Sequence, residues 1–548
     1  MRARARFIAS RFLRSSPLRH ERFRLFYAGS VGTALGYTMQ ATVAAWLMAT
    51  LTTSALMVAL VQTASTVPSL LFGLFAGALA DIVDRRRVVM LTQILLLSAT
   101  LVLGVATLAD LIGPISLLAL TFVIGVGFTF YIPAQQALVN DLVPRADLPP
   151  AVALAAVAFN VARSVGPALA GAIAAWLGSG VALMVSGVFF FAMIFALRGW
   201  PTQERAIPGV PETVLSGVQS GLRYLRHSPP LRSFVIRNLS FTICASSLWA
   251  LLPVIARDQL QLGAGGFGVL LGFFGAGAIV GALWIPRHLR KMSLNAVVTG
   301  GVLVWAVAAL AIAFAPDLFV AIAGTCAAGA AWVSVMASLS AGTQSSAPGW
   351  VRARAVATNL VAMQASLALG SVIWGGVAAT AGTKVALSAS VTVMMLLFVL
   401  SHRVRVALGN EADVTMGVQP PELSIAVEPM PDDGPVLIQV EYRIDADDRT
   451  AFLRAIRAIE VIRRRNGASS WRVFRDLEDD GRFVERFVIT SWAEYTRQRQ
   501  RMTVSDRELQ DRVTRLNLSH VPIRVSRLIG VGPDSIPDED TTPKGRDS

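Results

Sequence analysis

The chain contains few charged residues and almost no cysteine. Of its 548 residues only 15% are charged, whereas an average soluble domain has about 25%. The two cysteines, Cys244 and Cys326, both lie in apolar segments. The composition therefore argues against a water-soluble enzyme of several domains. The cysteines support neither a disulfide framework nor a cysteine-based zinc site.

Other functional signals are also missing from the sequence. No Gly-x-x-x-x-Gly-Lys-[Ser/Thr] phosphate loop occurs, so ATP hydrolysis by this chain is not expected. The arginine-rich arm 1–24 has no apolar core of signal-peptide length, because Arg11 and Arg14 interrupt it. We expect this arm to remain on the cytoplasmic side. We predict no metal, no cofactor and no nucleic-acid partner.

Apolar residues are abundant instead. They make up 54% of the chain, and the mean hydropathy is +0.57. A helix that crosses the ~30 Å hydrocarbon layer needs about 20 mostly apolar residues. Twelve segments satisfy this condition: 26–49, 56–80, 88–108, 115–138, 154–177, 181–197, 234–256, 267–285, 294–314, 318–341, 357–380 and 385–400. They are too long and continuous for barrel strands, so the sequence predicts an all-α membrane protein.

Positive charges are unevenly distributed along the chain. Residues 1–420 hold 28 Lys+Arg and 12 Asp+Glu, whereas residues 421–548 hold 21 and 23. If the N-terminus is cytoplasmic, 25 of the 28 lie on that side, Arg257 and Lys384 lie outside, and Arg163 lies within a span. The positive-inside rule then predicts a multi-pass protein of a bacterial inner membrane, with both termini in the cytoplasm.

The second six spans repeat the first at an offset of 204 residues. The matching pairs are Gly77 and Gly281, Arg86 and Arg290, Pro144 and Pro348, Asn160 and Gln364, Gly166 and Gly370, and Gly171 and Gly375. We therefore predict two six-helix bundles, 25–197 and 233–405, joined by a cytoplasmic linker, 198–232. Parallel repeats of this kind form transporters whose binding site lies between the halves.

The loop after the second span carries a recognisable motif, Gly77-Ala-Leu-Ala-Asp81-Ile-Val-Asp84-Arg85-Arg86-Arg87. It resembles the loop signature of the major facilitator superfamily, with Ile82 in place of a basic residue and Asp84 in place of a glycine. Two further segments, 143–148 (Val-Pro-Arg-Ala-Asp-Leu) and 160–167 (Asn-Val-Ala-Arg-Ser-Val-Gly-Pro), are similar to the transmembrane secretion effectors. That branch includes the exporter of the siderophore enterobactin. The resemblance implies the twelve-helix major facilitator fold.

The same resemblance implies a charged latch for the outward-facing state. In it, Asp81 pairs with Arg85 or Arg86, Asp141 offers a second acid, and Gly77 lets its helix approach a neighbour closely. The alternative is that the arginines only anchor the loop on the cytoplasmic side. That alternative explains the basic residues but not the two acids.

The fifth span carries small residues at four-residue spacing, from Ala158 through Gly166 to Ala174, which suits tight helix packing. Gly166 and Pro167 belong to a segment that resembles the motif of antiporters in the superfamily. This resemblance favours export, and Pro167 is expected to bend the helix. Generic packing of small residues is the alternative interpretation.

Arg163 is the most informative single residue of the sequence. It lies about 13 Å into its span at ~1.5 Å per residue, where an arginine costs ~2.5–3.5 kcal/mol and should meet a partner. Asn160 shares its helix face. Arg163 either attracts an anionic or strongly polar group of the substrate or belongs to a structural hydrogen-bond network. The other substrate-binding candidates are Gln40, Gln135, Gln136, Gln364 and Trp249.

The last part of the chain has a different, soluble pattern. Residues 406–434 are rich in proline and acids and read as a linker. Strand-like segments at 436–443, 470–475, 482–489 and 521–528 alternate with helical patterns at 446–465 and 491–516. The order βαββαβ predicts a small α+β ferredoxin-like domain over 435–531, followed by a disordered tail, 532–548. It resembles the dimeric α/β-barrel domains related to antibiotic-biosynthesis monooxygenases.

These observations favour a transporter over an enzyme. We predict a secondary active exporter of a small amphiphilic molecule such as a drug or siderophore, working by alternating access. It is expected to use protons, although the spans contain no central carboxylate to carry them. An importer of the same fold and a membrane-tethered oxygenase are the alternatives. The C-terminal domain offers one histidine and no evident acid–base pair, so we expect it to mediate self-association or regulation.

Overall fold

The structure is a computed structural model of the chain. It describes residues 17–200, 222–288, 292–401 and 429–530, together with residues 414, 415, 417 and 425. Its contacts divide the chain into two compact units. The first comprises residues 1–214, 233–342 and 357–407, and the second comprises residues 215–232, 343–356 and 408–548. The second unit therefore takes two short segments from the membrane part of the chain as well as the C-terminal domain.

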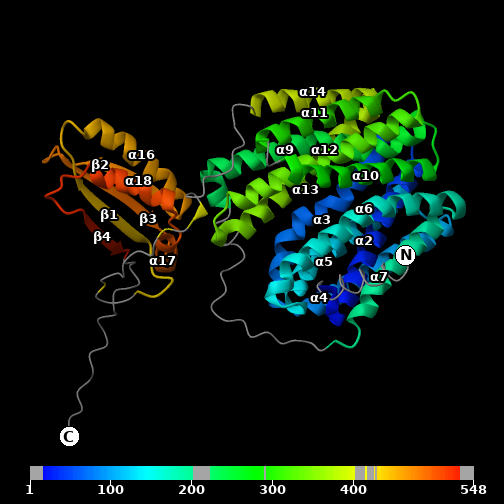
Figure 1. Ribbon diagram of the computed structural model, residues 1–548, viewed down its shortest axis with the longest axis horizontal. Coiled ribbons are helices and arrows are strands. Elements are labelled where there is room, and N and C mark those ends of the chain that lie inside the picture. Colours follow the sequence, from blue (N-terminus) through cyan, green and yellow to red (C-terminus); the bar gives the residue numbers. More distant parts are fainter. Residues whose placement is uncertain are drawn as a thin grey trace, which may run out of the picture. The chain divides into compact units, whose positions relative to one another are not determined.

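Twelve long helices account for the membrane part (Figure 1). Those of the first half are α2 (Glu21–Leu51), α3 (Ala55–Ile82), α4 (Arg85–Leu108), α5 (Pro114–Leu142), α6 (Leu148–Leu177) and α7 (Ser179–Leu197). Those of the second half are α9 (Pro229–Val254), which continues into the π-helical turn η3 (Ile255–Gln259), α10 (Ala264–His288), α11 (Leu294–Ala313), α12 (Leu318–Ser345), α13 (Gly349–Ala381) and α14 (Thr383–Ser401). Each predicted span falls on one of these helices, so the twelve-helix prediction is confirmed.

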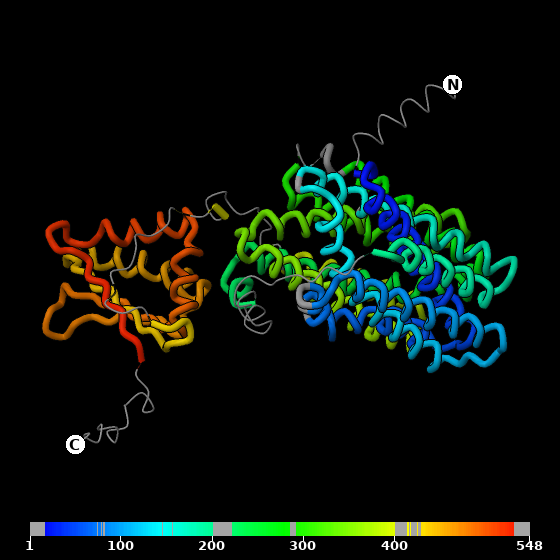
Figure 2. Tube along the Cα trace, turned by 90° about the horizontal axis from the view of Figure 1, so that it is seen from below, coloured from blue at the N-terminus to red at the C-terminus, as the bar shows by residue number. Residues whose placement is uncertain are grey.

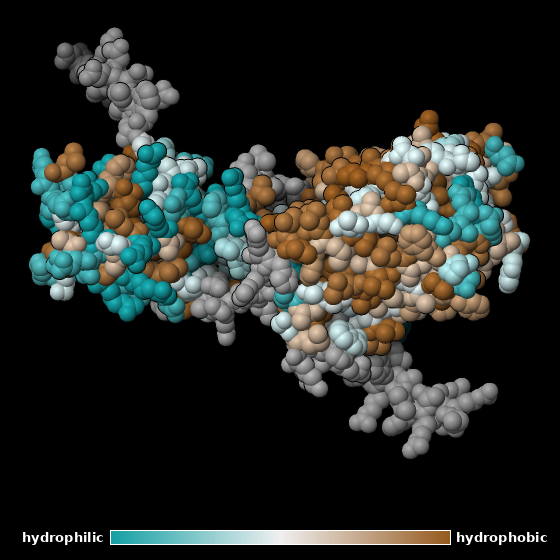
Figure 3. Space-filling view, turned by 90° about the horizontal axis from the view of Figure 1, so that it is seen from above, coloured by the Kyte–Doolittle hydropathy of each residue, from teal (hydrophilic) through white to brown (hydrophobic). Residues whose placement is uncertain are grey.

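Eleven of the helices among the described residues are long and apolar enough to cross a membrane. The twelfth, α2, has 31 residues with three glycines and four threonines, and it packs along α6 and α7. Large apolar side chains lie exposed on the first unit, including Trp176, Phe319 and Leu111. Figure 3 shows apolar residues covering much of the visible surface of these helices. Such a continuous apolar surface suits contact with lipid.

The 204-residue repeat reappears as equivalent helix contacts. A Cβ atom added to Gly166 of α6 would meet the side chain of Thr38 on α2, and one added to Gly370 of α13 would meet Ser246 on α9. The fifth helix of each half therefore packs closely on the first helix of the same half. Small residues permit this close approach, which is why the repeat preserves glycine at these positions.

Contacts between the two halves lie away from the arginine loop. We call the side on which α3 ends and Arg85 begins α4 the basic side. The contacts lie in those parts of the helices that are farther from the basic side. There α6 packs on α10. The Thr63 hydroxyl of α3 donates to the Ala368 carbonyl of α13 at 3.1 Å. At the remote end, Arg257 Nη1 donates to the Thr52 carbonyl at 2.8 Å. These contacts close the far side of the helical unit.

The C-terminal domain contains four strands and three helices among the described residues. Its elements are β1 (Val436–Arg443), α16 (Arg449–Arg465), β2 (Ala468–Arg475), β3 (Arg482–Ile489), α17 (Trp492–Gln500), α18 (Val504–Arg515) and β4 (Arg524–Ile529). The four strands form one antiparallel sheet in the order β2-β3-β1-β4. Helices α16 and α18 pack together on one face of it (Figures 1 and 2). Alternate residues of β1 are buried, as expected for a sheet covered on one face.

A buried ion pair lies in the core of this domain. The Glu485 side chain is fully buried and accepts hydrogen bonds from Arg463 Nε at 3.0 Å, Trp471 Nε1 at 3.0 Å and the Tyr442 hydroxyl at 3.1 Å. Burial opposes its charge, but Arg463 and these hydrogen bonds outweigh burial, so the pKa of Glu485 lies below its usual value. The domain thus buries a carboxylate only together with its partners.

We expect Glu485→Gln to destabilise the domain by about 3–5 kcal/mol, because it leaves the Arg463 charge buried without a counterion. Hydrogen exchange of the β1 and β3 amides in the full-length protein measures the loss. Glu441→Gln is the control, since its partly exposed pair with Arg482 should contribute no more than about 1 kcal/mol. Because the folded pKa of Glu485 is depressed, its stabilisation is present above the unfolded pKa and is lost as the pH falls through the folded pKa. Equal effects of the two substitutions would contradict this assignment.

Candidate functional site

Arg163 reaches from the first half of the chain into the second. Its guanidinium lies 5.0 Å from the ring centre of Trp249 on α9 and 6.0 Å from that of Trp332 on α12. The Tyr37 phenol of α2 is near enough to interact with it electrostatically. Within the described residues, no carboxylate forms an ion pair with Arg163. The charge is therefore held by the faces of aromatic rings, a contact that stabilises a cation more as water is removed.

Two aromatic pairs flank this position and follow the internal repeat. Tyr37 and Phe128 stack with ring centres 3.7 Å apart, and Phe241 and Trp332 lie 5.8 Å apart. Tyr37 and Phe241 are 204 positions apart, as are Phe128 and Trp332. Arg163 breaks the symmetry, because the equivalent position holds Leu367. The two halves therefore have matched aromatic pairs, but of the equivalent positions 163 and 367 only the first holds a cation.

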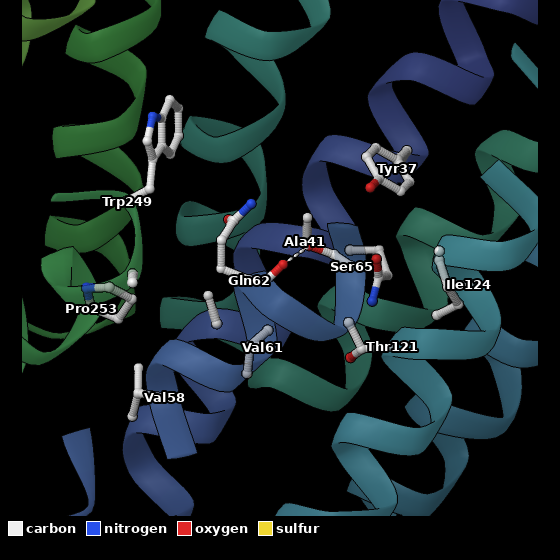
Figure 4. Close-up of a pocket in the computed structure, with 14 residues that line it drawn as sticks. Tyr37, Ala41, Val58, Val61, Gln62, Ser65, Thr121, Ile124, Trp249 and Pro253 are labelled. Atoms are coloured by element: carbon white, nitrogen blue, oxygen red, sulfur yellow. Dashed lines mark hydrogen bonds between the residues drawn. The ribbon is translucent and has the colours of Figure 1, made fainter. Parts of the chain in front are cut away.

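A small cavity lies beside these residues, between the two halves (Figure 4). Tyr37 and Gln40 from α2, Gln62 from α3, and Trp249 and Pro253 from α9 line it. Its volume is about 50 Å³, which holds one or two water molecules. The Gln40 side chain is buried, and its amide nitrogen has no hydrogen-bond partner among the described residues. In this conformation the central cavity is small, and polar side chains such as Gln40 and Gln62 line it beside apolar ones such as Val58 and Ile124.

A larger cavity lies nearer the basic side. Its volume is about 570 Å³, within the range that binds drug-sized molecules. Its lining comes from α2, α5 and α6 and includes aliphatic, aromatic and polar side chains: Ser30, Ala34, Phe128, Tyr131, Ile132, Gln135, Gln136, Val139, Asn140, Val152, Ala155, Ala158 and Phe159. Phe128 lines this cavity and also stacks on Tyr37, which lines the central cavity. The two cavities are thus adjacent.

The structure distributes the predicted binding residues over several places. Gln40 and Trp249 line the central cavity, and Arg163 contacts Trp249. Gln135 and Gln136 line the larger cavity. Asn160 is exposed on α6, and Gln364 is half-buried on α13; neither lines these two cavities. The six amide-bearing or aromatic candidates therefore do not form one cluster around Arg163.

The predicted gating residues form part of a network on the basic side. Arg85 Nη1 donates to Asp141 at 2.9 Å and to the Ala137 carbonyl at 3.1 Å, which ties the start of α4 to the end of α5. Arg86 Nε donates to the Leu197 carbonyl at the end of α7. The Asp81 side chain lies outside the described residues. These bonds are all within the first half of the chain.

The expectation for Gly77 is not met in this conformation. A Cβ atom added there would meet no described residue within 4 Å, so α3 makes no close contact at Gly77 with another helix that the structure describes. Gly166 does lie in a close contact, against Thr38. The Pro167 carbonyl faces α10, where a Cβ on Gly268 would lie 2.7 Å from its oxygen. The small residues of α6 therefore serve two contacts, one with α2 and one with α10.

Sequence reasoning missed two buried residues of the membrane helices. Arg237, counted among the cytoplasmic charges, is buried within α9, and its guanidinium lies 5.7 Å from the ring centre of Phe398. The predicted span 234–256 already contained Arg237, so counting its charge as cytoplasmic overlooked its place inside the helix. Trp332 was not singled out, although its equivalence to Phe128 at the 204-residue offset could have indicated it. The Trp374 ring nitrogen donates to the Ile243 carbonyl at 2.7 Å.

Comparison with known proteins places the chain in a family. The family model described as "Transmembrane secretion effector" matches residues 13–533. The chain belongs to this family of major facilitator transporters. The match includes the C-terminal domain, so the family model extends over both the membrane part and this domain. Its membership makes the chain a transporter and not an enzyme.

Two transporters are similar to parts of this secretion effector. The multidrug efflux pump Tap of Mycolicibacterium fortuitum is 29% identical over 391 residues, which are 69% of this chain and 93% of the relative. The staphyloferrin A transporter of Staphylococcus aureus is 24% identical over 250 residues, 45% of this chain and 63% of the relative. About three-tenths of the secretion effector therefore has no counterpart in Tap.

Solved structures show the same fold. A bacterial homologue of the human lysosomal transporter Spinster, in an inward-facing and occupied conformation, superimposes with a TM-score of 0.59. The match covers 71% of this chain and 98% of that one at 14% identity. The match to the nucleoside transporter NupG covers 70% of this chain and 98% of that one, with a TM-score of 0.56 at 12% identity. At these identities the likeness concerns the fold alone.

Proposed function

We propose that this secretion effector exports small amphiphilic molecules across a bacterial inner membrane by alternating access. One observation carries the proposal: the two halves contact each other away from the basic side, while a cavity of about 570 Å³ lies toward it. By the positive-inside rule the basic side is cytoplasmic, so both termini are cytoplasmic and the conformation is open inward. An exporter loads its cargo in this state.

Arg163 is the proposed contact for an anionic group of the cargo. Its charge is partly shielded by aromatic rings and has no carboxylate partner within the described residues, so an incoming anion would meet an uncompensated cation. Asn160 and Gln364 are proposed to contact the cargo in another conformation. The names of the relatives support small-molecule cargo, because one is a multidrug efflux pump and another a staphyloferrin A transporter.

The loop network is the proposed cytoplasmic gate. In the outward-facing state the basic ends of the two halves must meet, and the proposal assigns to Asp81, Arg85, Arg86 and Asp141 the charge pairs that form or break there. The Arg85–Asp141 pair is partly exposed, so its contribution in any one state is modest. A modest energy suits a gate, because both conformations must be populated. Proton coupling and self-association through residues 435–531 belong to the same proposal.

Transport in inverted membrane vesicles tests the function and its direction. With an inward-acid pH gradient, we expect vesicles containing the full-length protein to accumulate a fluorescent amphiphilic anion several-fold above vesicles without it. An uncoupler should abolish the difference if protons drive the exchange. Vesicles of the opposite orientation are the control. Accumulation only in vesicles of the opposite orientation would identify an importer. No accumulation in either orientation would show that amphiphilic anions are not the cargo.

A further inference from the structure

The second unit contains a cluster of arginines, aromatic rings and one carboxylate that the transport mechanism does not use. Three of its residues precede or begin membrane helices, namely Arg223 and Tyr224 ahead of α9 and Trp350 at the start of α13. The other three belong to the C-terminal domain, namely Arg465, Glu494 and Arg501. We call these six residues the clasp.

The aromatic part of the clasp is closely packed. The rings of Tyr224 and Trp350 lie 5.3 Å apart, edge to face at 89°. The Arg501 guanidinium lies 4.2 Å from the ring centre of Trp350, and that of Arg465 lies 5.2 Å from the ring centre of Tyr224. Tyr224 is only 2% exposed. Each ring of the membrane segments is therefore covered by one cation of the C-terminal domain, a favourable contact when water is excluded.

A buried carboxylate links the same two groups of residues. Glu494 accepts a hydrogen bond from Arg223 Nη2 at 2.6 Å and from Arg501 Nη1 at 3.0 Å, and Arg497 Nε adds a third at 3.0 Å. The Glu494 side chain is 7% exposed. Burial opposes its charge, but Arg501 and Arg223 outweigh burial and hold the pKa of Glu494 below its usual value. Removing Arg223 from this site would leave a buried carboxylate with fewer partners.

The backbone of the domain is shaped around this carboxylate. Gly467, between α16 and β2, has a positive φ of 131°. A Cβ atom there would lie 3.0 Å from Glu494 Oε1 and 3.5 Å from Arg223 Nη2. A side chain at this turn would thus be strained and would also press on the Arg223–Glu494 pair. The turn at Gly467 therefore leaves room for the Arg223 side chain, which comes from outside the C-terminal domain.

We propose that the C-terminal domain is bound non-covalently, through the clasp, to the two chain segments that lead into α9 and α13. The domain is then attached at three places, by the chain after α14, by the linker residues 223–224 and by the first turn of α13. Trp350 lies in the part of α13 that belongs to the second unit, and the same helix continues from residue 357 into the first. Binding of the domain therefore restrains the start of a helix that must move during transport. This inference does not depend on the direction of transport.

Cleavage of the covalent connection tests the clasp. A protease site is inserted between residues 402 and 413 of the full-length protein, the purified protein is cut, and the membrane part is captured by an N-terminal tag. We expect the C-terminal domain to remain with the membrane part at low salt. We expect Trp350→Ala and Glu494→Gln each to lower the retained fraction at least about fivefold. Arg501→Lys should retain more domain than Arg501→Gln, since lysine keeps the charge but not the planar group.

Two comparisons keep the result decisive. Arg472→Gln is the matched control, because Arg472 is exposed on β2 and outside the clasp; it should not change retention. Hydrogen exchange of the β1 and β3 amides separates release of a folded domain from unfolding, and Trp350→Ala changes no residue of that domain. Release of the unsubstituted domain on cutting would overturn the proposal. Equal retention in Trp350→Ala, Glu494→Gln and Arg472→Gln would also overturn it.

Discussion

Arg163→Gln should reduce export of an anionic amphiphile by about 10- to 100-fold while leaving the protein abundant in the membrane. A hydrogen bond to a charged group contributes about 1.5–3 kcal/mol, and each 1.4 kcal/mol corresponds to a factor of ten. Arg163 is half-buried between Trp249 and Trp332, so removing its charge leaves the rings in place and removes only the cation. The measurement is the initial rate of uptake into inverted vesicles, over a range of cargo concentrations.

The controls separate a binding role from a structural one. Arg163→Lys keeps a positive charge without the planar guanidinium, so it should retain part of the affinity for the anion and lose the stacking. Trp176→Ala lies on the same helix and is 85% exposed, and it should leave the rate unchanged. If Arg163→Gln lowers protein abundance and export together, Arg163 has a structural role. If it changes neither, both roles are excluded.

The helices and strands could be read from the sequence because their patterns are long and regular. Strands β1 and β3 begin and end where the alternation of apolar residues does, at Val436–Arg443 and Arg482–Ile489. The Gly166 and Gly370 contacts follow from the repeat. These features depend on local periodicity and on the small volume of glycine, which a sequence states directly.

The centre of the protein could be predicted only in part. The depth of Arg163 in its span was evident, but its aromatic partners come from α9 and α12, and only the crossing of α6 with the second half brings them together. The Tyr37–Phe128 stack could have pointed to Phe241 and Trp332 through the 204-residue offset. The dispersal of Gln135, Gln136 and Gln364 could not have been predicted, because it depends on which conformation the protein adopts.

The clasp shows a different limit of sequence reasoning. Tyr224 and Trp350 are far apart in the chain and lie in segments that look like ordinary connections between spans. Their partners Arg465 and Arg501 are two of many arginines in the C-terminal domain. Only the three-dimensional structure separates the arginines that cover a ring from those that face water.

Gly268→Ala should shift this secretion effector away from the conformation described here and reduce transport at least about fivefold. An added Cβ would lie 2.7 Å from the Pro167 carbonyl oxygen and 2.8 Å from the Gly171 Cα. These are backbone atoms, so α6 and α10 must separate. Overpacking of this kind costs about 1–3 kcal/mol, which changes the ratio of two conformations by roughly 5- to 150-fold. The conformation closed on the far side bears that cost, because the α6–α10 contact belongs to it.

Cysteine labelling measures the shift. A cysteine at Gln136, in the cavity toward the basic side, should react more slowly in Gly268→Ala, whereas one at Ala45, in the central cavity, should become reactive from the far side. Gly376→Ala is the matched control, since a Cβ at that glycine of α13 meets nothing within 4 Å. If both glycine substitutions leave labelling and transport unchanged, the α6–α10 contact does not hold the far side closed. The expected result is that only Gly268→Ala changes labelling, with slower labelling at position 136 and faster labelling at position 45. That result would show that the two halves move as rigid bodies about the α6–α10 contact.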